Sequence, residues 1–205
     1  MAPLRLGRVA ALIVLLCAVF PAGASALSSP RHHPSRALSV THHTCVNVNL
    51  RPTSTNLKLI RVATLCLINR ERMLHGERPL RPNRRLRRAA QAHSQSMALG
   101  DYFQHDGAGG PGGGTPLARM RSVGYISSSR VGFEVGENIA WGTLSLSTPR
   151  AIVASWMASP GHRANILDPH YRETGIGVSP HPISSRAHGQ AGAIYTQDFG
   201  VIMRG

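Results

Sequence analysis

Apolar side chains recur every three to four residues in two long segments, and this spacing predicts two amphipathic helices. The first begins near Thr55 and ends at Gly76. The second follows Asn83, a residue type that favours the N-cap position, and ends at Gly100. We therefore expect the domain to open with two consecutive helices.

Two shorter helices are predicted further along, each opened by a Thr-Pro pair, which is typical of an N-cap followed by the first helical residue. One lies between Thr115 and Gly124. The other lies between Thr148 and Ser159, and a turn over residues 162–167 is expected to follow it. Trp156 falls on the apolar stripe of this last helix and is interpreted as a core residue.

Three segments have the apolar content of strands. Residues 133–142 are expected to form a strand or a buried turn, and residues 174–179 and 193–200 two further strands. The pattern as a whole predicts an α+β fold with helices on both sides of a small, mostly antiparallel sheet.

The first 26 residues have the features of a secretory signal peptide. Arg5 and Arg8 precede an apolar stretch over residues 9–20, and Ala24 and Ala26 form a small-residue cleavage pattern. The stretch is shorter than the roughly 18 residues of a membrane span, although a retained membrane anchor is the alternative. No later segment is apolar for long enough to cross a membrane. We therefore expect an exported protein.

The mature chain is divided by composition. Residues 27–54 are rich in Ser, Pro, His and Arg and predict a flexible leader, and residues 55–205 predict the folded domain. Cys45 and Cys66 remain after signal cleavage. An even number of cysteines in an exported chain favours a disulfide between them, and two buried free thiols are the alternative.

The chain is strongly basic, with a formal net charge of +14 and 23 lysine and arginine residues. Its basic residues are spread over all segments, and only 5% of its residues are aromatic, which disfavours nucleic acid as a partner. The charge instead favours anionic cell-envelope polymers or membrane surfaces. Lys58 is the only lysine, a bias that suggests GC-rich coding.

Three polar residues at predicted element boundaries are the candidate site: His105, Glu137 and His162. Two imidazoles and one carboxylate suit a divalent metal such as zinc. The same three groups could also transfer protons without a metal. In the alternative, structural interpretation each side chain bonds only to nearby backbone. His93 lies on an apolar helix face and is interpreted as a hydrogen-bonded core histidine.

Six motifs occur in one order and together resemble the bacterial branch of the CAP superfamily, which contains SCP-like domains, cysteine-rich secretory proteins, antigen 5 and plant pathogenesis-related 1 proteins. The resemblance runs from about Leu67 to Gly200. The motifs are LINRER at 67–72, AHSQSM at 92–97, FQH at 103–105, GENI at 136–139, WMASPGHRANIL at 156–167 and YTQDFG at 195–200.

The resemblance implies an α-β-α sandwich with a central cleft, which in many members carries two histidines and two glutamates and in some binds a divalent metal. The family's histidines match His105 and His162, and its first glutamate matches Glu137. The second glutamate, found in eukaryotic members, is replaced here by Ser159. The resemblance therefore implies at most a site with two histidines and one glutamate.

Three functions follow as hypotheses. The first is a secreted binding or interaction module, extracellular or attached to the cell wall, that contacts envelope material, lipid or another extracellular protein. The second is a metal-assisted hydrolase, a peptidase or cell-wall enzyme, that uses the same cleft. The third is a lipid-binding protein. Because one carboxylate of the family's set is absent, the binding module is favoured.

Overall fold

The structure is a computed structural model that describes residues 44–107, 112–128 and 131–203. The predicted signal peptide over residues 1–26 and most of the predicted leader lie outside the described residues. Among the described helices, none combines the length and the apolar character that a membrane span requires.

The sheet has four strands in the order β1-β3-β4-β2. β2 (Gly132–Thr143) and β4 (Gly192–Met203) pair antiparallel along their whole length, and β3 (Glu173–Ser179) is antiparallel to β4. The two-residue strand β1 (Arg81–Pro82) joins the outer edge of β3 in parallel. The predicted small, mostly antiparallel sheet is confirmed.

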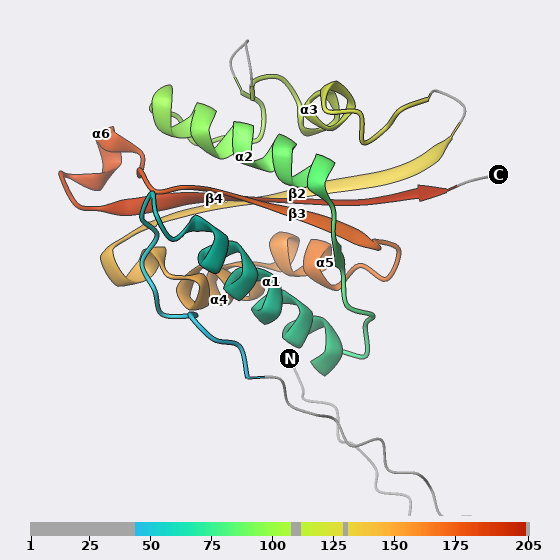
Figure 1. The fold of residues 1–205 in the computed structure, drawn as a ribbon, viewed down its shortest axis with the longest axis horizontal. Helices are drawn as coiled ribbons and strands as arrows, with labels where there is room; N and C mark the ends of the chain where they lie inside the picture. Colours follow the sequence, from blue (N-terminus) through green and yellow to red (C-terminus); the bar gives the residue numbers. More distant parts are fainter. Residues whose placement is uncertain (1–43, 108–111, 129–130, 204–205) are drawn as a thin grey trace, which may run out of the picture. The chain divides into compact units, whose positions relative to one another are not determined.

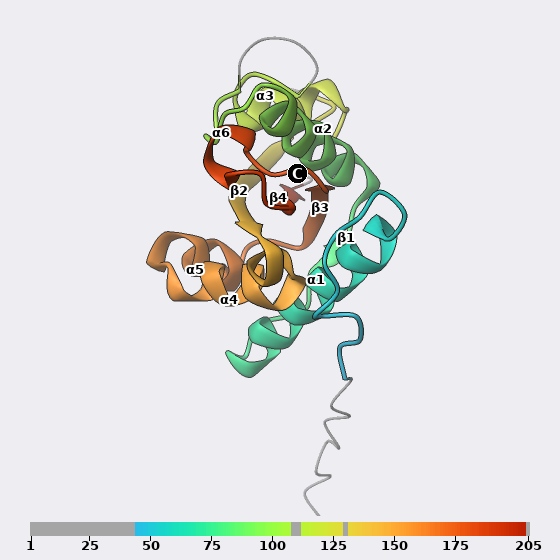
Figure 2. The same ribbon diagram turned by 90° about the vertical axis from the view of Figure 1, so that its left-hand side faces the viewer.

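Helices cover both faces of this sheet. α2 (Arg84–Leu99) and α3 (Pro116–Ser122) lie on one face, and α1 (Leu57–Leu74), α4 (Pro149–Ala158) and α5 (Pro160–Leu167) lie on the other, as Figures 1 and 2 show from two directions. The fold is therefore an α-β-α sandwich of the α+β class, as expected.

Three of the predicted helices begin where their capping residues predict. Asn83 accepts hydrogen bonds from the amides of Arg85 and Leu86 at 2.8 and 3.3 Å. Thr115 and Thr148 cap α3 and α4 in the same way, each accepting from an amide three residues ahead. These side chains satisfy amides that have no partner inside the helix.

Residues 162–167 form helix α5 rather than the predicted turn. The reason is local: Pro160, which ends α4, also occupies the first position of a new helix, with Ser159 as its N-cap. The strand predicted over residues 133–142 exists and is one residue longer at each end. β1, the 3₁₀ helix η1 (Leu144–Ser147) and α6 (Ser184–Ala187) were not predicted, because such short elements show no periodicity.

α2 lies directly on β3 because two glycines of the strand have no side chain. A Cβ atom on Gly175 would be 2.0 Å from the amide nitrogen of Arg87, and one on Gly177 would be 2.2 Å from the carbonyl carbon of Ala90. Below the sheet, the indole nitrogen of Trp156 donates to the carbonyl oxygen of Ile139 at 3.1 Å, and Trp156 is fully buried. The interpretation of Trp156 as a core residue is confirmed.

The chain before α1 is attached to the domain covalently and by packing. The predicted disulfide joins Cys45 to Cys66 of α1, with the two Cα atoms 5.7 Å apart. Val48 is buried, and its carbonyl oxygen accepts a hydrogen bond from the amide of Arg150 at 2.9 Å. The packed region therefore includes residues that the sequence placed in the leader.

Candidate functional site

Glu137 is the centre of a buried polar cluster. Its side chain is 2% exposed on β2, and its two carboxylate oxygens have different partners. The Nδ1 atom of His105 is 2.8 Å from Oε1, and the guanidinium of Arg119 donates to Oε2 at 2.5 Å. The structure thus brings together two of the three predicted residues, His105 and Glu137, and adds an arginine that the sequence analysis missed.

Arg119 reaches Glu137 from α3 and is itself only 3% exposed. It also donates to the carbonyl oxygen of Gly114, which lies just before the helix. The sequence does not distinguish this arginine from the many others of the chain; it lies between Ala118 and Met120 in a short helix. Its role depends on a contact 18 residues away in the chain, which local pattern does not encode.

His93 of α2 is fully buried and lies beside the carboxylate of Glu137. Its ring nitrogens face the carbonyl oxygens of Gly112 and Gln104 at 3.1 and 3.0 Å, and Nε2 is 3.9 Å from Oε1 of Glu137. Burial lowers the pKa of His93, although the charge of Glu137 opposes this shift. His93 is therefore a hydrogen-bonded core histidine, as interpreted from the sequence. We call His93, His105, Arg119 and Glu137 the histidine–glutamate cluster.

His162 lies at the beginning of α5, which two asparagines attach to β2. Asn138, the neighbour of Glu137, donates to the backbone oxygen of His162 at 3.1 Å. Asn165 donates in turn to the side-chain oxygen of Asn138 at 2.9 Å. This places the third predicted residue beside the strand that carries Glu137. Burial, and repulsion from the His105 imidazole, lower the pKa of His162.

The charges of Glu137 and His105 stabilise each other. Burial alone would raise the pKa of Glu137, but the hydrogen bond from His105 and the charge of Arg119 outweigh burial and lower it. The hydrogen bond to Glu137 raises the pKa of His105. Near neutral pH the structure therefore favours an ionised carboxylate between the Arg119 guanidinium and an imidazole that retains its proton more readily than usual.

Asp198 is the second buried acid of this region. It lies on β4 directly opposite Glu137 in the strand register and is 1% exposed. Burial, together with repulsion from Glu137, raises the pKa of Asp198 well above its usual range. From the sequence, Asp198 was expected only as a weak candidate partner of a cleft histidine, because its place opposite Glu137 depends on the strand register that the structure provides.

The residues around Glu137 do not fit a preformed site for a divalent metal. Both carboxylate oxygens already have cationic or ring-nitrogen partners, and the guanidinium of Arg119 would repel a dication. Ser159, at the position of the family's second glutamate, lies between α4 and α5 and supplies no carboxylate. A metal at His105, Glu137 and His162 would have to displace the ion pair with Arg119, and it remains a prediction.

Among the described residues, one group of acidic and histidine side chains has the spacing that a metal ion requires. Ligand atoms of Glu134, Asp168 and His170 all lie within 4.8 Å of one another, and Nδ1 of His170 is 3.0 Å from Asp168. None of the three predicted residues belongs to it. All three side chains are substantially solvent-accessible, and the group contains no buried polar atom without a partner. The group therefore meets the spacing requirement for a metal ion, and no second observation supports a bound metal.

Comparison with known proteins gives the family. Residues 65–199 match the model of the cysteine-rich secretory protein family, CAP. Because this match covers most of the chain, the protein belongs to the CAP family. The resemblance stated from the motifs is confirmed.

Similar proteins occur in several bacteria. The uncharacterized protein YkwD of Bacillus subtilis (strain 168) is 36% identical over 133 residues, which are 65% of this chain and 44% of YkwD. An extracellular protein of Bacillus anthracis str. Ames that contains an SCP domain has a TM-score of 0.54 at 28% identity, over 75% of this chain and 44% of that one. The chain thus spans less than half the length of these two relatives.

The fold also resembles that of an outer surface protein from Borrelia burgdorferi. The TM-score is 0.53, over 75% of this chain and 96% of the other, at 16% identity. At this identity the likeness concerns the fold alone.

Proposed function

We propose that this protein is an extracellular binding module of the cell envelope, and that the histidine–glutamate cluster holds an anionic group of its ligand directly. An exported protein is supported by the signal-peptide pattern, by the disulfide between Cys45 and Cys66, and by the extracellular description of the similar Bacillus anthracis protein. A binding role is supported by the contacts of Glu137.

The observation that carries the proposal is that His105 and Arg119 share one carboxylate. When His105 is protonated, the two cations exceed the charge of Glu137 by one unit. The His105 side chain is 50% exposed, and its outer nitrogen Nε2 has no hydrogen-bond partner among the described residues. An imidazolium held by Glu137 and open on its other side is a donor for a carboxylate or phosphate of a ligand.

The test is a binding titration with soluble peptidoglycan fragments that carry free peptide carboxylates, in a buffer that contains a metal chelator. We expect binding at pH 6 that weakens at pH 8, because only the protonated imidazole donates through both nitrogens. His105→Gln should weaken binding by about tenfold, the effect of losing one charge-assisted hydrogen bond.

His181→Gln is the matched control, because His181 is exposed and lies outside the cluster. Its binding should equal that of the wild type. Equal losses in both variants would overturn the proposal, and so would binding that requires added zinc. Fragments that fail to bind while lipid vesicles do bind would favour the lipid-binding hypothesis instead.

A hydrolase is the second candidate, and one observation favours it. The surroundings shift the pKa values of His105 and His162 in opposite directions, upward for His105 and downward for His162. An imidazole whose pKa is lowered suits a general base, and one whose pKa is raised suits a general acid. In this mechanism His162 takes a proton from water as it attacks, and His105 donates one to the leaving group.

Incubation with peptidoglycan in the presence of a chelator tests the hydrolase directly. Release of soluble fragments that His162→Gln abolishes would establish it. Unchanged peptidoglycan after prolonged incubation, together with measurable binding, would leave the binding module as the function.

A further inference from the structure

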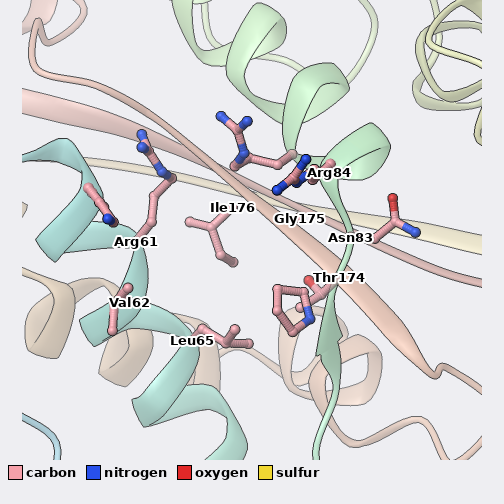
Figure 3. A pocket seen from close by; sticks show the side chains of 11 residues that line it. Arg61, Val62, Leu65, Asn83, Arg84, Thr174, Gly175 and Ile176 are labelled. Atoms are coloured by element: carbon pink, nitrogen blue, oxygen red, sulfur yellow. The ribbon is translucent and has the colours of Figure 1, made fainter.

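A second site lies on the opposite edge of the sheet, where β3 has only a two-residue neighbour. A groove of about 500 Å³ opens there between α1 and the first turn of α2. None of the residues of the histidine–glutamate cluster lines it. Figure 3 shows Ile176 of β3 on its floor, between Arg61 of α1 and Arg84 of α2.

On the outer edge of β3, backbone groups of Thr174 and Val178 have hydrogen-bond partners, whereas among the described residues those of Ile176 have none. The carbonyl oxygen of Thr174 accepts from the amide of Asn83 at 2.8 Å. The side chain of Gln91 bonds both backbone groups of Val178, donating to its oxygen at 2.9 Å and accepting from its nitrogen at 3.2 Å. The backbone N–H and C=O groups of every second residue point to the same edge of a strand. Because those of Thr174 and Val178 point to the outer edge, those of Ile176 do so too, and they point into the groove.

Among the described residues, nothing bonds the outward N–H and C=O of Ile176. Ile176 is 4% exposed, so this peptide group has little access to bulk water except through the groove. Unpaired backbone groups in such a position are a template for one more extended chain.

The walls of the groove are cationic. Lys58, Arg61, Arg84 and Arg87 line it, and no acidic residue does. The first turn of α2 contains no acidic side chain, although a helix N-terminus favours negative charge and disfavours the arginines found there. Arg61 and Arg87 both line the groove, and burial followed by repulsion from Arg87 lowers the pKa of Arg61. An anion between the two helices would relieve this repulsion.

The groove also has an apolar part. Val62 and Leu65, one turn apart on α1, line it together with the side chain of Ile176. Val62 is 58% exposed, so it offers apolar surface to a ligand in the groove. A ligand therefore meets charge, an open strand edge and apolar surface within one short groove.

We propose that this groove binds an extended acidic segment of another protein, in which acidic and apolar side chains alternate. The backbone of the segment pairs with Ile176, its carboxylates contact Arg61 and Arg84, and its apolar side chains cover Val62 and Leu65. This is strand addition to an open sheet edge, with specificity from the alternate side chains. A free polyanion would contact the arginines but would not pair with the backbone of Ile176. A lipid has no peptide backbone that could pair with this strand edge.

The test is fluorescence anisotropy with a short labelled peptide of alternating glutamate and valine, added to the mature protein. The double variant Arg61→Gln, Arg84→Gln should bind at least about tenfold more weakly, because two charge-assisted hydrogen bonds are lost. The matched control is Arg70→Gln, Arg85→Gln, which removes the same charge from the same two helices outside the groove. It should change the affinity by less than about twofold.

A second peptide distinguishes backbone pairing from charge as the source of the affinity. The same peptide with N-methylated valine amides should bind about fivefold more weakly, because the strand pairing is blocked while every charge remains. Equal losses in the groove variant and its control would overturn the proposal. So would unchanged binding of the N-methylated peptide, which indicates a polyanion site, or binding of anionic vesicles without binding of the peptide.

Discussion

Glu137 on β2 and Asp198 on β4 occupy one register position on neighbouring antiparallel strands, and both carboxyl groups are buried. Glu137 has two cationic partners, whereas neither oxygen of Asp198 accepts a hydrogen bond from a described donor. Asp198 is therefore best accommodated as the neutral acid, because burial and the charge of Glu137 both raise its pKa. The pair divides its charges: one acid is ionised and the other is not.

The first prediction concerns Asp198→Asn. Because the folded state holds the proton of Asp198 more tightly than the unfolded state, the contribution of this group is complete below the unfolded pKa of about 3.9 and is lost as pH rises toward the folded pKa. The asparagine variant should lack this loss. Its unfolding free energy should exceed that of the wild type above about pH 5, by up to about 1.4 kcal/mol per pH unit.

Urea unfolding from pH 4 to pH 8 measures this difference, with the exposed Asp106→Asn as control. If the two variants show the same pH dependence as the wild type, Asp198 is ionised in the folded protein and the carboxyl pair is not as described.

The second prediction concerns the pKa of His105. Its hydrogen bond with Glu137 should hold the pKa of His105 above the usual value of about 6.5, and Glu137→Gln should return it toward that value. The stabilisation from this contact is complete below about pH 6.5 and is lost as pH rises through the pKa of the folded state. Titration of the imidazole proton signals by NMR measures both values. A His105 pKa that does not change in the variant would contradict the contact.

The sequence predicts a residue of this site where its role depends on a local pattern or a family motif. It does not predict a role that depends on tertiary packing or strand register. The helix limits at Asn83 and Thr115 were predictable because capping is a local interaction between residues three apart. His105, Glu137 and His162 were found because each belongs to a family motif. Arg119 was missed because its role arises from the packing of α3 on β2. Asp198 was expected only as a partner of a cleft histidine, because its place opposite Glu137 arises from the register of β2 with β4.

The third prediction tests the role of Arg119. Arg119→Met removes the buried partner of Glu137, and leaving that charge buried should lower the unfolding free energy by about 3–5 kcal/mol. Combining it with Glu137→Gln should recover part of the loss, because the charge that needed a partner is then absent. A double-mutant cycle from urea unfolding gives the coupling energy, expected to be at least about 1 kcal/mol. Additive effects of the two substitutions would mean that the ion pair has no stabilising role.

The fourth prediction concerns the contact between α2 and β3. Gly177→Ala places a Cβ atom against the backbone of Ala90, which cannot rotate away, so the unfolding free energy should fall by about 3 kcal/mol or more. Gly161→Ala is the control, since nothing lies within 4 Å of the added atom and the position is helical. Thermal unfolding followed by circular dichroism compares the two. Equal melting temperatures would show that α2 does not lie on the strand at this distance.

The central claim is that the histidine–glutamate cluster contacts an envelope ligand directly and without a metal. The most direct measurement is the NMR spectrum of the histidine rings, recorded in a chelator while soluble peptidoglycan fragments are added. We expect the signals of His105 and His162 to shift with fragment concentration, while the signal of the exposed His181 does not. Signals of His105 and His162 that stay unchanged until zinc replaces the chelator would contradict it.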